Sequence, residues 1–314
     1  MSRLGISIAV LSLALSGLFS QAYAAPNDER DVAKLTSFGG MCVRCELAGR
    51  KLTGAQFTGA NFANAILIGS DLRGAAFYGS NFANADLTRA DLRGAEMRGA
   101  NFTNANFTDA HLSGVESSGA NFQGANLTRV DLSSAELHGA NLLGANLSKA
   151  NLSSSELNGA NLASVNGRGG NFRNTEFNNA NLSGGRFDGA DMRGAEFNGA
   201  TLRGAVFTGA NLRGVELPGA MLGGADLSGA LGLDQDQLDE ACGDAGTRLP
   251  RGLVVRPCRG RDIRVVVDFN RAKADVTRAR AEAARAAAAE AQRATAWAAP
   301  RPPKPPAPPK PPKE

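Results

Sequence analysis

Large apolar residues recur at every fifth position through most of this chain. From Leu47 to Leu227, 37 consecutive positions five residues apart carry Leu, Phe or Met, with Ser117 and Gly167 as the two exceptions. Ala usually stands two residues before each of these centres, a polar residue stands directly before it, and Gly follows two residues after it. The repeated unit is therefore A-(N/D)-L-x-G, and it runs without an insertion.

A period of five matches neither the 3.6-residue period of a helix nor the two-residue alternation of a strand. It is typical of a chain that turns a corner every five residues. The large apolar side chain and Ala then point inward, and the polar residues point outward. Gly near each corner tolerates positive φ at little steric cost, and Asn or Asp can hydrogen-bond the turn backbone.

A second period, four repeat units long, indicates how many sides each coil has. Because the same residue returns at every fourth repeat, identical residues should stack as columns on a four-sided coil. The run predicts about nine coils and, at ~4.8 Å per coil, a rod roughly 45 Å long. The two clearest columns are Glu96, Glu116, Glu136, Glu156, Glu176, Glu196 and Glu216, and Asn61, Asn81, Asn101, Asn121, Asn141, Asn161 and Asn181.

This repeat resembles the pentapeptide-repeat family over residues 45–229. The resemblance implies an all-β fold, a right-handed quadrilateral parallel β-helix. Some members of that family resemble duplex DNA in shape and charge and bind DNA gyrase. We therefore expect a repeat region at 47–230, an N-terminal cap at 25–46 and a C-terminal cap at 231–269, with short helices over Asp28–Leu35 and Asp234–Cys242.

The four cysteines lie at the two ends of the predicted rod, Cys42 and Cys45 at one end and Cys242 and Cys258 at the other. A disulfide needs Cα atoms within about 7 Å, so the rod length allows only Cys42–Cys45 and Cys242–Cys258. Cys42 should occupy a centre position and Cys45 an Ala position in a first, irregular coil. Free core thiols and redox or metal chemistry remain as alternatives.

Residues 1–24 are typical of a signal peptide. Arg3 precedes an apolar run over Leu4–Phe19, and Ala22-Tyr23-Ala24 forms a cleavage site that would leave Ala25 as the first residue. We expect a periplasmic or secreted protein, an environment in which disulfides form. An uncleaved membrane anchor is the alternative.

The C-terminal segment differs in composition from the repeats. Residues 270–299 are Ala-rich and predict a helix. Residues 300–314 are rich in Pro and Lys and predict an extended polyproline II spacer. The positive charge of this tail suits an anionic envelope surface. A solubilising disordered tail is the alternative.

Charge and chemistry favour a binding rod over an enzyme. Residues 46–229 carry 16 acidic and 14 basic residues, a net charge of −2. No catalytic constellation or cofactor motif is present in the sequence, so we expect no enzymatic activity and no cofactor. The partner would be a protein or an envelope polymer. Mimicry of DNA toward gyrase is the alternative, but it requires a strongly acidic surface and a cytoplasmic location. Export argues against nucleic-acid binding.

The seven glutamates that stack in one column, hereafter the Glu column, differ in their neighbours. Four of them have Arg three residues earlier, which predicts the pairs Arg93/Glu96, Arg173/Glu176, Arg193/Glu196 and Arg213/Glu216. Glu116, Glu136 and Glu156 have Ser there. We hypothesise that these three carboxylates, with His138 at the rim, bind a cation or a basic segment. A solvated column without a ligand is the alternative.

The two interior exceptions predict local irregularity. Ser117 and Gly167 remove apolar volume from their coils. At Gly167 we expect a side chain from the next coil to fill the space, together with a local bulge.

Overall fold

The structure is a computed structural model that describes residues 41–258. The expected signal peptide, the helix over Asp28–Leu35, the Ala-rich helix and the Pro-rich tail lie outside the described residues. Between residues 41 and 258, no helix is long and apolar enough to cross a membrane.

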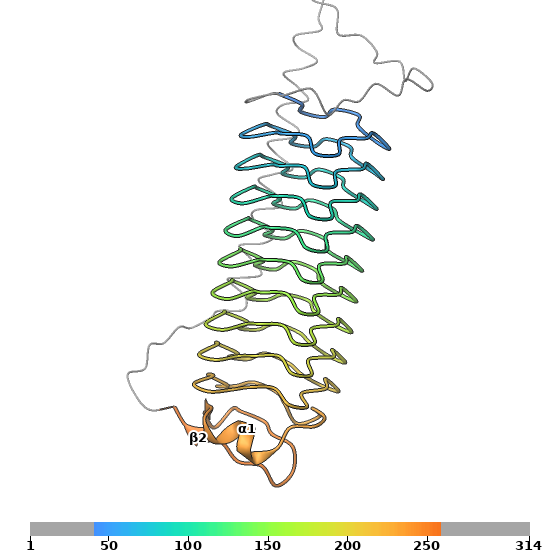
Figure 1. Ribbon diagram of the computed structural model, residues 1–314. Helices are drawn as coiled ribbons and strands as arrows, with labels where there is room; N and C mark the ends of the chain where they lie inside the picture. The colour runs from blue at the N-terminus through green and yellow to red at the C-terminus, as the bar shows by residue number, and fades with distance from the viewer. Residues whose placement is uncertain (1–40, 259–314) are drawn as a thin grey trace, which may run out of the picture. The chain divides into compact units, whose positions relative to one another are not determined.

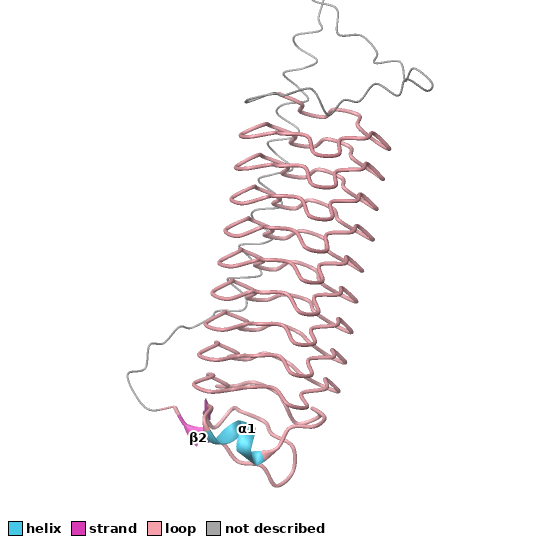
Figure 2. Ribbon diagram, viewed as in Figure 1, coloured by secondary structure: helices cyan, strands magenta, loops and turns pink. Residues whose placement is uncertain are grey.

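The described repeats form a stack of four-sided coils (Figure 1). Parallel bridges pair each residue before a centre with the residue 20 positions later, from Met41↔Asn61 to Asn211↔Leu231. This pairing confirms the coil of four repeats and hence the quadrilateral parallel β-helix. Each side contributes one bridged residue, so Figure 2 draws the coils as loop.

The corners are tight turns with a left-handed residue. The N–H groups of Leu52 and Gly54 donate to the carbonyls of Asp71 and Arg73 in the next coil at 2.7 and 2.9 Å, and Ala55 N–H donates back to Leu52 at 3.1 Å. With φ of +67° at Gly54, this is a type II turn. Every fifth residue from Arg44 to Gly224 has φ between 52° and 69°, so the corner is the position that favours Gly.

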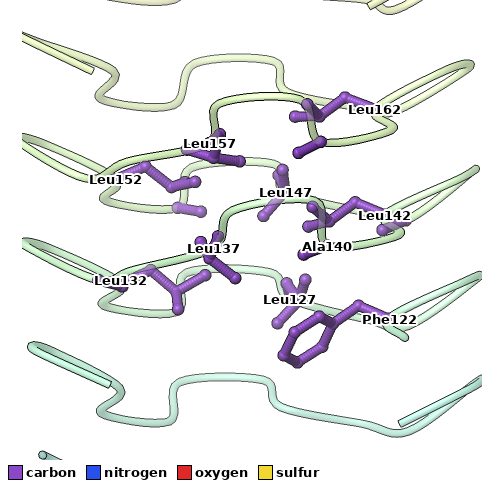
Figure 3. Close-up of a cluster of buried hydrophobic side chains, with 14 of the residues drawn as sticks. Phe122, Leu127, Leu132, Leu137, Ala140, Leu142, Leu147, Leu152, Leu157 and Leu162 are labelled. Carbon is purple, nitrogen blue, oxygen red and sulfur yellow. The ribbon is translucent and has the colours of Figure 1, made fainter. Parts of the chain in front are cut away.

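The interior is a column of close-packed side chains. Figure 3 shows Leu and Phe centres converging from the four sides of successive coils, with Ala140 at a corner between them. Where Phe recurs at the same place in consecutive coils, the rings stack: consecutive ring centroids along Phe62, Phe82, Phe102 and Phe122 lie 4.7, 5.1 and 5.0 Å apart. Two large side chains per side would not fit, which explains Ala at the other inward position.

Gly167 is filled from the next coil, and the predicted bulge is wrong. A Cβ atom at Gly167 would lie 2.7 Å from Phe187 Cδ1 and 3.1 Å from Phe172 Cζ. The two rings therefore occupy the missing volume, and they contact each other edge to face with centroids 5.6 Å apart. Because the space is filled, the regular bridge Asn166↔Arg186 persists.

Ser117 introduces an unsatisfied hydroxyl into the core. Its side chain is fully buried, and its Oγ has no hydrogen-bond partner among the described residues. By contrast, the buried Ser155 hydroxyl donates to the Leu152 carbonyl at 2.5 Å.

We expect Ser117→Ala to raise the free energy of unfolding by about 1 kcal/mol, because it removes a buried polar group that makes no hydrogen bond. Ser155→Ala should lower that free energy, since it deletes a hydroxyl that is satisfied. Chemical denaturation of both variants checks the prediction, and a loss of stability in Ser117→Ala would contradict it.

The N-terminal end carries a disulfide within one turn. Cys42 and Cys45 are bonded with Cα atoms 5.2 Å apart, and both pack against the core. The expected irregularity of this coil is absent, because Met41 and Glu46 already form the regular bridges to Asn61 and Ile66. The disulfide therefore joins the centre position of one ordinary repeat to the Ala position of the next, across one corner.

The C-terminal cap contains the helix α1 (Gln235–Asp239) and the parallel two-residue strands β1 (Cys242–Gly243) and β2 (Arg256–Pro257). The cap lies beyond the last coil (Figure 2). The predicted helix over Asp234–Cys242 is too long: Asp234 is the N-cap, but the helix stops before Cys242. Cys242 must be extended because it bridges Met221 of the coil beneath. Cys242 and Cys258 form the second disulfide.

The cap satisfies backbone groups that the last coil would otherwise expose. Gln237 Nε2 donates to the carbonyls of Leu212 and Val215 at 3.1 and 2.9 Å. Thr247 Oγ1 donates to the Leu222 carbonyl at 2.9 Å. Leu238 of α1 is fully buried and closes the apolar interior. The cap thus covers an end that could otherwise pair with another chain.

Candidate functional site

The coils present polar columns whose side chains interact mainly with each other. In the Asn column, Asn81 Nδ2 donates to Asn61 Oδ1 at 3.1 Å, and that oxygen also accepts the Ala63 N–H at 3.1 Å. The same contact joins each later pair down to Asn181. This column is largely self-satisfied, so it offers few free groups to a ligand.

A second face carries Asp–Arg pairs within single repeats. Arg93 Nη2 lies 2.6 Å from Asp91 Oδ2, and Arg193 Nη2 lies 2.6 Å from Asp191 Oδ2. The predicted pairs of these arginines with Glu96 and Glu196 are therefore wrong. Residues two apart on one side share a face, whereas residues three apart are separated by a corner.

The Asp–Arg pairs lower the pKa of their carboxyl groups. The hydrogen bond from Arg73, which outweighs partial burial, lowers the pKa of Asp71 to about 2. The same cause lowers the pKa of Asp91 and Asp191. A carboxyl group with a depressed folded-state pKa contributes stability above its unfolded pKa and loses it as the pH falls through the folded pKa.

We expect the free energy of unfolding to fall as the pH is lowered from about 4 to about 2. The Asp71→Asn variant should show a weaker dependence over this range. At neutral pH the free energy of unfolding of this variant should fall by less than about 1 kcal/mol, because the Asp71–Arg73 pair is exposed and screened by solvent. Denaturation at pH 5, 3 and 2 measures both effects. An identical pH slope for the variant would contradict the prediction.

The Glu column is a continuous stack. Glu116, Glu136 and Glu156 are bridged in succession, as the spacing predicts. Two of the three have cationic or titratable neighbours that the sequence reasoning did not assign. Arg98 pairs with Glu116, and His138 Nε2 lies 2.8 Å from Glu156 Oε2. Glu136 is exposed and has no side-chain partner in the part of the chain that the structure describes.

The His138 imidazole therefore serves the next glutamate rather than Glu136. Contacts of this kind join the outward position after a centre to the glutamate of the next coil, 18 positions later in the chain. Asn158 and Asn178 follow the same rule, donating to Glu176 and Glu196 at 2.8 and 3.1 Å. Within residues 41–258, no three acidic, His or Cys side chains converge in a group that could hold a metal ion.

The last member of the Glu column opens onto a groove that sequence reasoning missed. Glu216 lines it together with the apolar Val215, Leu217 and Pro218 and with residues of the cap, namely Asp236, Gln237 and Glu240. The groove exists because α1 folds back over the final coil. It combines the exposed Pro218 with three carboxylates, whereas Val215 and Leu217 are buried core residues.

Family comparisons match the entire repeated region. The pentapeptide repeats (8 copies) model matches residues 42–77, 155–194 and 195–231, the pentapeptide repeat region model matches 85–162, and the pentapeptide repeats (9 copies) model matches 62–105. Together these matches run from residue 42 to 231, more than half of the chain, and they coincide with the bridged coils. The chain belongs to the pentapeptide-repeat family.

Several solved structures are similar to this chain. HetL from the cyanobacterium Nostoc sp. strain PCC 7120, involved in heterocyst differentiation regulation, is 31% identical, with 63% of this chain and 91% of HetL covered and a TM-score of 0.36. A trypsin-treated variant of QnrB1, a plasmid-mediated fluoroquinolone resistance protein, is 23% identical over 58% of this chain and 90% of its own, with a TM-score of 0.40. Rfr23 from the cyanobacterium Cyanothece 51142 is 28% identical over 37% and 90%, with a TM-score of 0.21. Among curated proteins, none matches.

Proposed function

We propose that this pentapeptide-repeat protein is a non-enzymatic rod of about nine coils that acts outside the cytoplasm and binds a protein or an envelope polymer through its polar faces. The unbroken register of the coils carries this proposal. No loop interrupts the bridges between Met41 and Leu231, and the interior is filled by buried side chains. The coils therefore supply surfaces rather than a cleft.

Export is supported by the sequence of residues 1–24 and by the two disulfides at the ends of the described rod. The intact mass of the native protein from separate cell fractions tests it. We expect a periplasmic or secreted species that begins at Ala25 and is four hydrogens lighter than its reduced form. A full-length, reduced species in the cytosol would contradict the proposal.

The binding role needs its own test. A photoreactive residue in place of the exposed His111 would lie on the face of the Asp–Arg pairs. Irradiation of intact cells should give a discrete adduct in the envelope fraction, identified by mass. Absence of an adduct, both at this position and at a second position in the Asn column, would argue against an interaction rod.

An assay of gyrase inhibition distinguishes the proposed binding rod from the alternative function, mimicry of DNA. On the described surface, arginines pair with several of the aspartates, including Asp109 with Arg129 at 2.6 Å and Asp188 with Arg168 at 2.8 Å. This internal neutralisation is unlike the phosphate charge of DNA, which is about one negative charge per 1.7 Å. Purified protein should leave DNA supercoiling by gyrase unchanged. Inhibition in that assay would favour DNA mimicry instead.

A further inference from the structure

The carboxylates of the Glu column are not equally compensated. Glu116 and Glu156 contact a charged or titratable side chain, and Glu176 and Glu196 accept a hydrogen bond from a neutral amide. The other three carboxylates have no hydrogen-bond or ion-pair partner in the part of the chain that the structure describes, namely those of Glu96, Glu136 and Glu216.

These three glutamates, hereafter the free glutamates, have an uneven spacing. Each bridge joins residues one coil apart, so Glu96 and Glu136 are separated by two coils, and Glu136 and Glu216 by four. At the spacing of paired strands, these intervals are about 9.6 and 19.2 Å. A ligand that matches the face would be narrow and extended, with cations on one side at intervals in the ratio of one to two.

The tail of this chain carries that charge pattern. Its basic residues Arg301, Lys304, Lys310 and Lys313 follow a three-residue period, in which Ala307 takes the middle place. A polyproline II segment has three residues per turn and rises 3.1 Å per residue. In that conformation the cations would share one face. Lys313 and Lys310 would lie about 9.3 Å apart, and Lys310 and Lys304 about 18.6 Å apart.

The two sets of intervals agree to about 1 Å over the whole column. Lys304, Lys310 and Lys313 would then face the three free glutamates in reverse order along the chain. Ala307 would face Glu176, which already accepts a hydrogen bond from Asn158. The one gap in the period of the tail thus falls opposite a glutamate that has a partner.

The groove at the end of the column suits the start of the same tail. In this orientation Arg301 lies one further interval beyond Glu216, where Asp236 and Glu240 of the cap supply carboxylates. Pro218, the exposed apolar residue that lines the groove, would contact the first prolines.

The chain connection also favours this orientation. The chain leaves the cap at Cys258, which its disulfide to Cys242 holds in place. Cys242 lines a second hollow that shares Glu240 with the groove. Between Cys258 and Arg301 lie 42 residues. Even as a continuous helix, at 1.5 Å per residue, these would span about 63 Å. The connection is therefore long enough for Arg301 to reach the groove.

We propose that the Pro/Lys-rich segment at 300–313 binds along the Glu column of its own chain, antiparallel to the stacking of the coils. Its lysines lie on Glu216, Glu136 and Glu96, and Arg301 lies in the groove of the cap. The segment would cover a face on which the described residues form an uninterrupted column of one charge sign. A partner that binds this face would have to displace the tail. This inference is independent of the proposed binding role outside the cytoplasm.

Carbodiimide cross-linking of the full chain, followed by peptide mass spectrometry, tests the proposal. The reagent joins a lysine amine to a carboxylate that it contacts. We expect three links, Lys304 to Glu216, Lys310 to Glu136 and Lys313 to Glu96, and far fewer links to Glu116 and Glu156. High salt should suppress them, because the contacts are exposed ion pairs. Links in the opposite order along the column would overturn the proposed orientation.

A register-shifted tail is the matched control for composition. The exchange Pro309→Lys with Lys310→Pro keeps the charge and the proline content but moves the middle lysine off the common face. We expect the yield of links to Glu136 to fall about threefold, as the loss of one exposed ion pair implies. An unchanged yield would overturn the proposal.

Two glutamate variants test the choice of carboxylates. Glu136→Gln with Glu216→Gln should lower the yield of the remaining link between Lys313 and Glu96. Glu116→Gln with Glu156→Gln removes the same charge from the same column and should not lower it. If both double variants lowered the yield of the Lys313–Glu96 link equally, the effect would depend only on the overall charge of the column, and the proposed pairing of lysines with glutamates would be overturned.

Mixing isotopically labelled and unlabelled protein identifies the source of the tail. Links within one isotopic species support binding to the same chain. Links between species in statistical proportion would show that the tail of a second copy occupies the column and would overturn the proposal as stated.

Discussion

Replacing Phe102 by Ala is expected to lower the free energy of unfolding by about 3–5 kcal/mol. Phe102 is fully buried and stacks between Phe82 and Phe122, with ring centroids 5.1 and 5.0 Å away, while Phe107 lies 5.3 Å away. The corners are held by hydrogen bonds to both neighbouring coils. The coil therefore has little freedom to collapse into the space left by the ring.

Phe102→Leu is the matched control. The same column carries Leu142 and Leu162 at equivalent positions, so the backbone accommodates Leu there. We expect a cost below about 1.5 kcal/mol. Chemical denaturation of both variants, followed by circular dichroism, gives the comparison. Equal stabilities for the Ala and Leu variants would show that the aromatic column is not tightly packed.

Introducing Leu at Gly167 is expected to destabilise the protein, although it restores the consensus of the repeat. The Cβ atom alone would lie 2.7 Å from the Phe187 ring, so one side chain must move or the coils must separate. Overpacking of this kind costs about 1–3 kcal/mol. Reasoning from the repeat pattern alone would predict stabilisation, so the sign of the effect, measured by chemical denaturation, is decisive.

The double variant Gly167→Leu with Phe187→Leu tests the cause. Shortening Phe187 should free the space that the introduced leucine needs. We expect the two changes to couple favourably by about 0.5–3 kcal/mol, within the range seen for residues in contact. Gly167→Ala should also be unfavourable on its own. Additive effects in the double variant would mean that Phe187 does not fill the position.

Several features of the fold follow from the sequence because the five-residue repeat determines both the local turns and the stacking of the coils. Once a corner falls every five residues, the inward and outward positions are determined from Leu52 onward, and identical residues four repeats apart must stack. The Asn column, the Glu column and the buried centres all follow from this rule. The irregular segments outside the repeat follow less well, as the short α1 shows.

The side-chain partners in the Glu column could not be predicted from short separations along the chain. Arg93 is close to Glu96 in sequence but is separated from it by a corner, whereas Arg98 meets Glu116 of the next coil. Such contacts depend on which rotamers reach between coils.

The sequence by itself therefore determined the period, the four sides, the interior residues and the family of this protein, because each depends only on the repeat register. The tertiary structure decided which carboxylates are neutralised, that the gap at Gly167 is filled without a bulge, and where the helix of the cap ends. These depend on distances between neighbouring coils, where side chains from different repeats compete for the same space and the same charges.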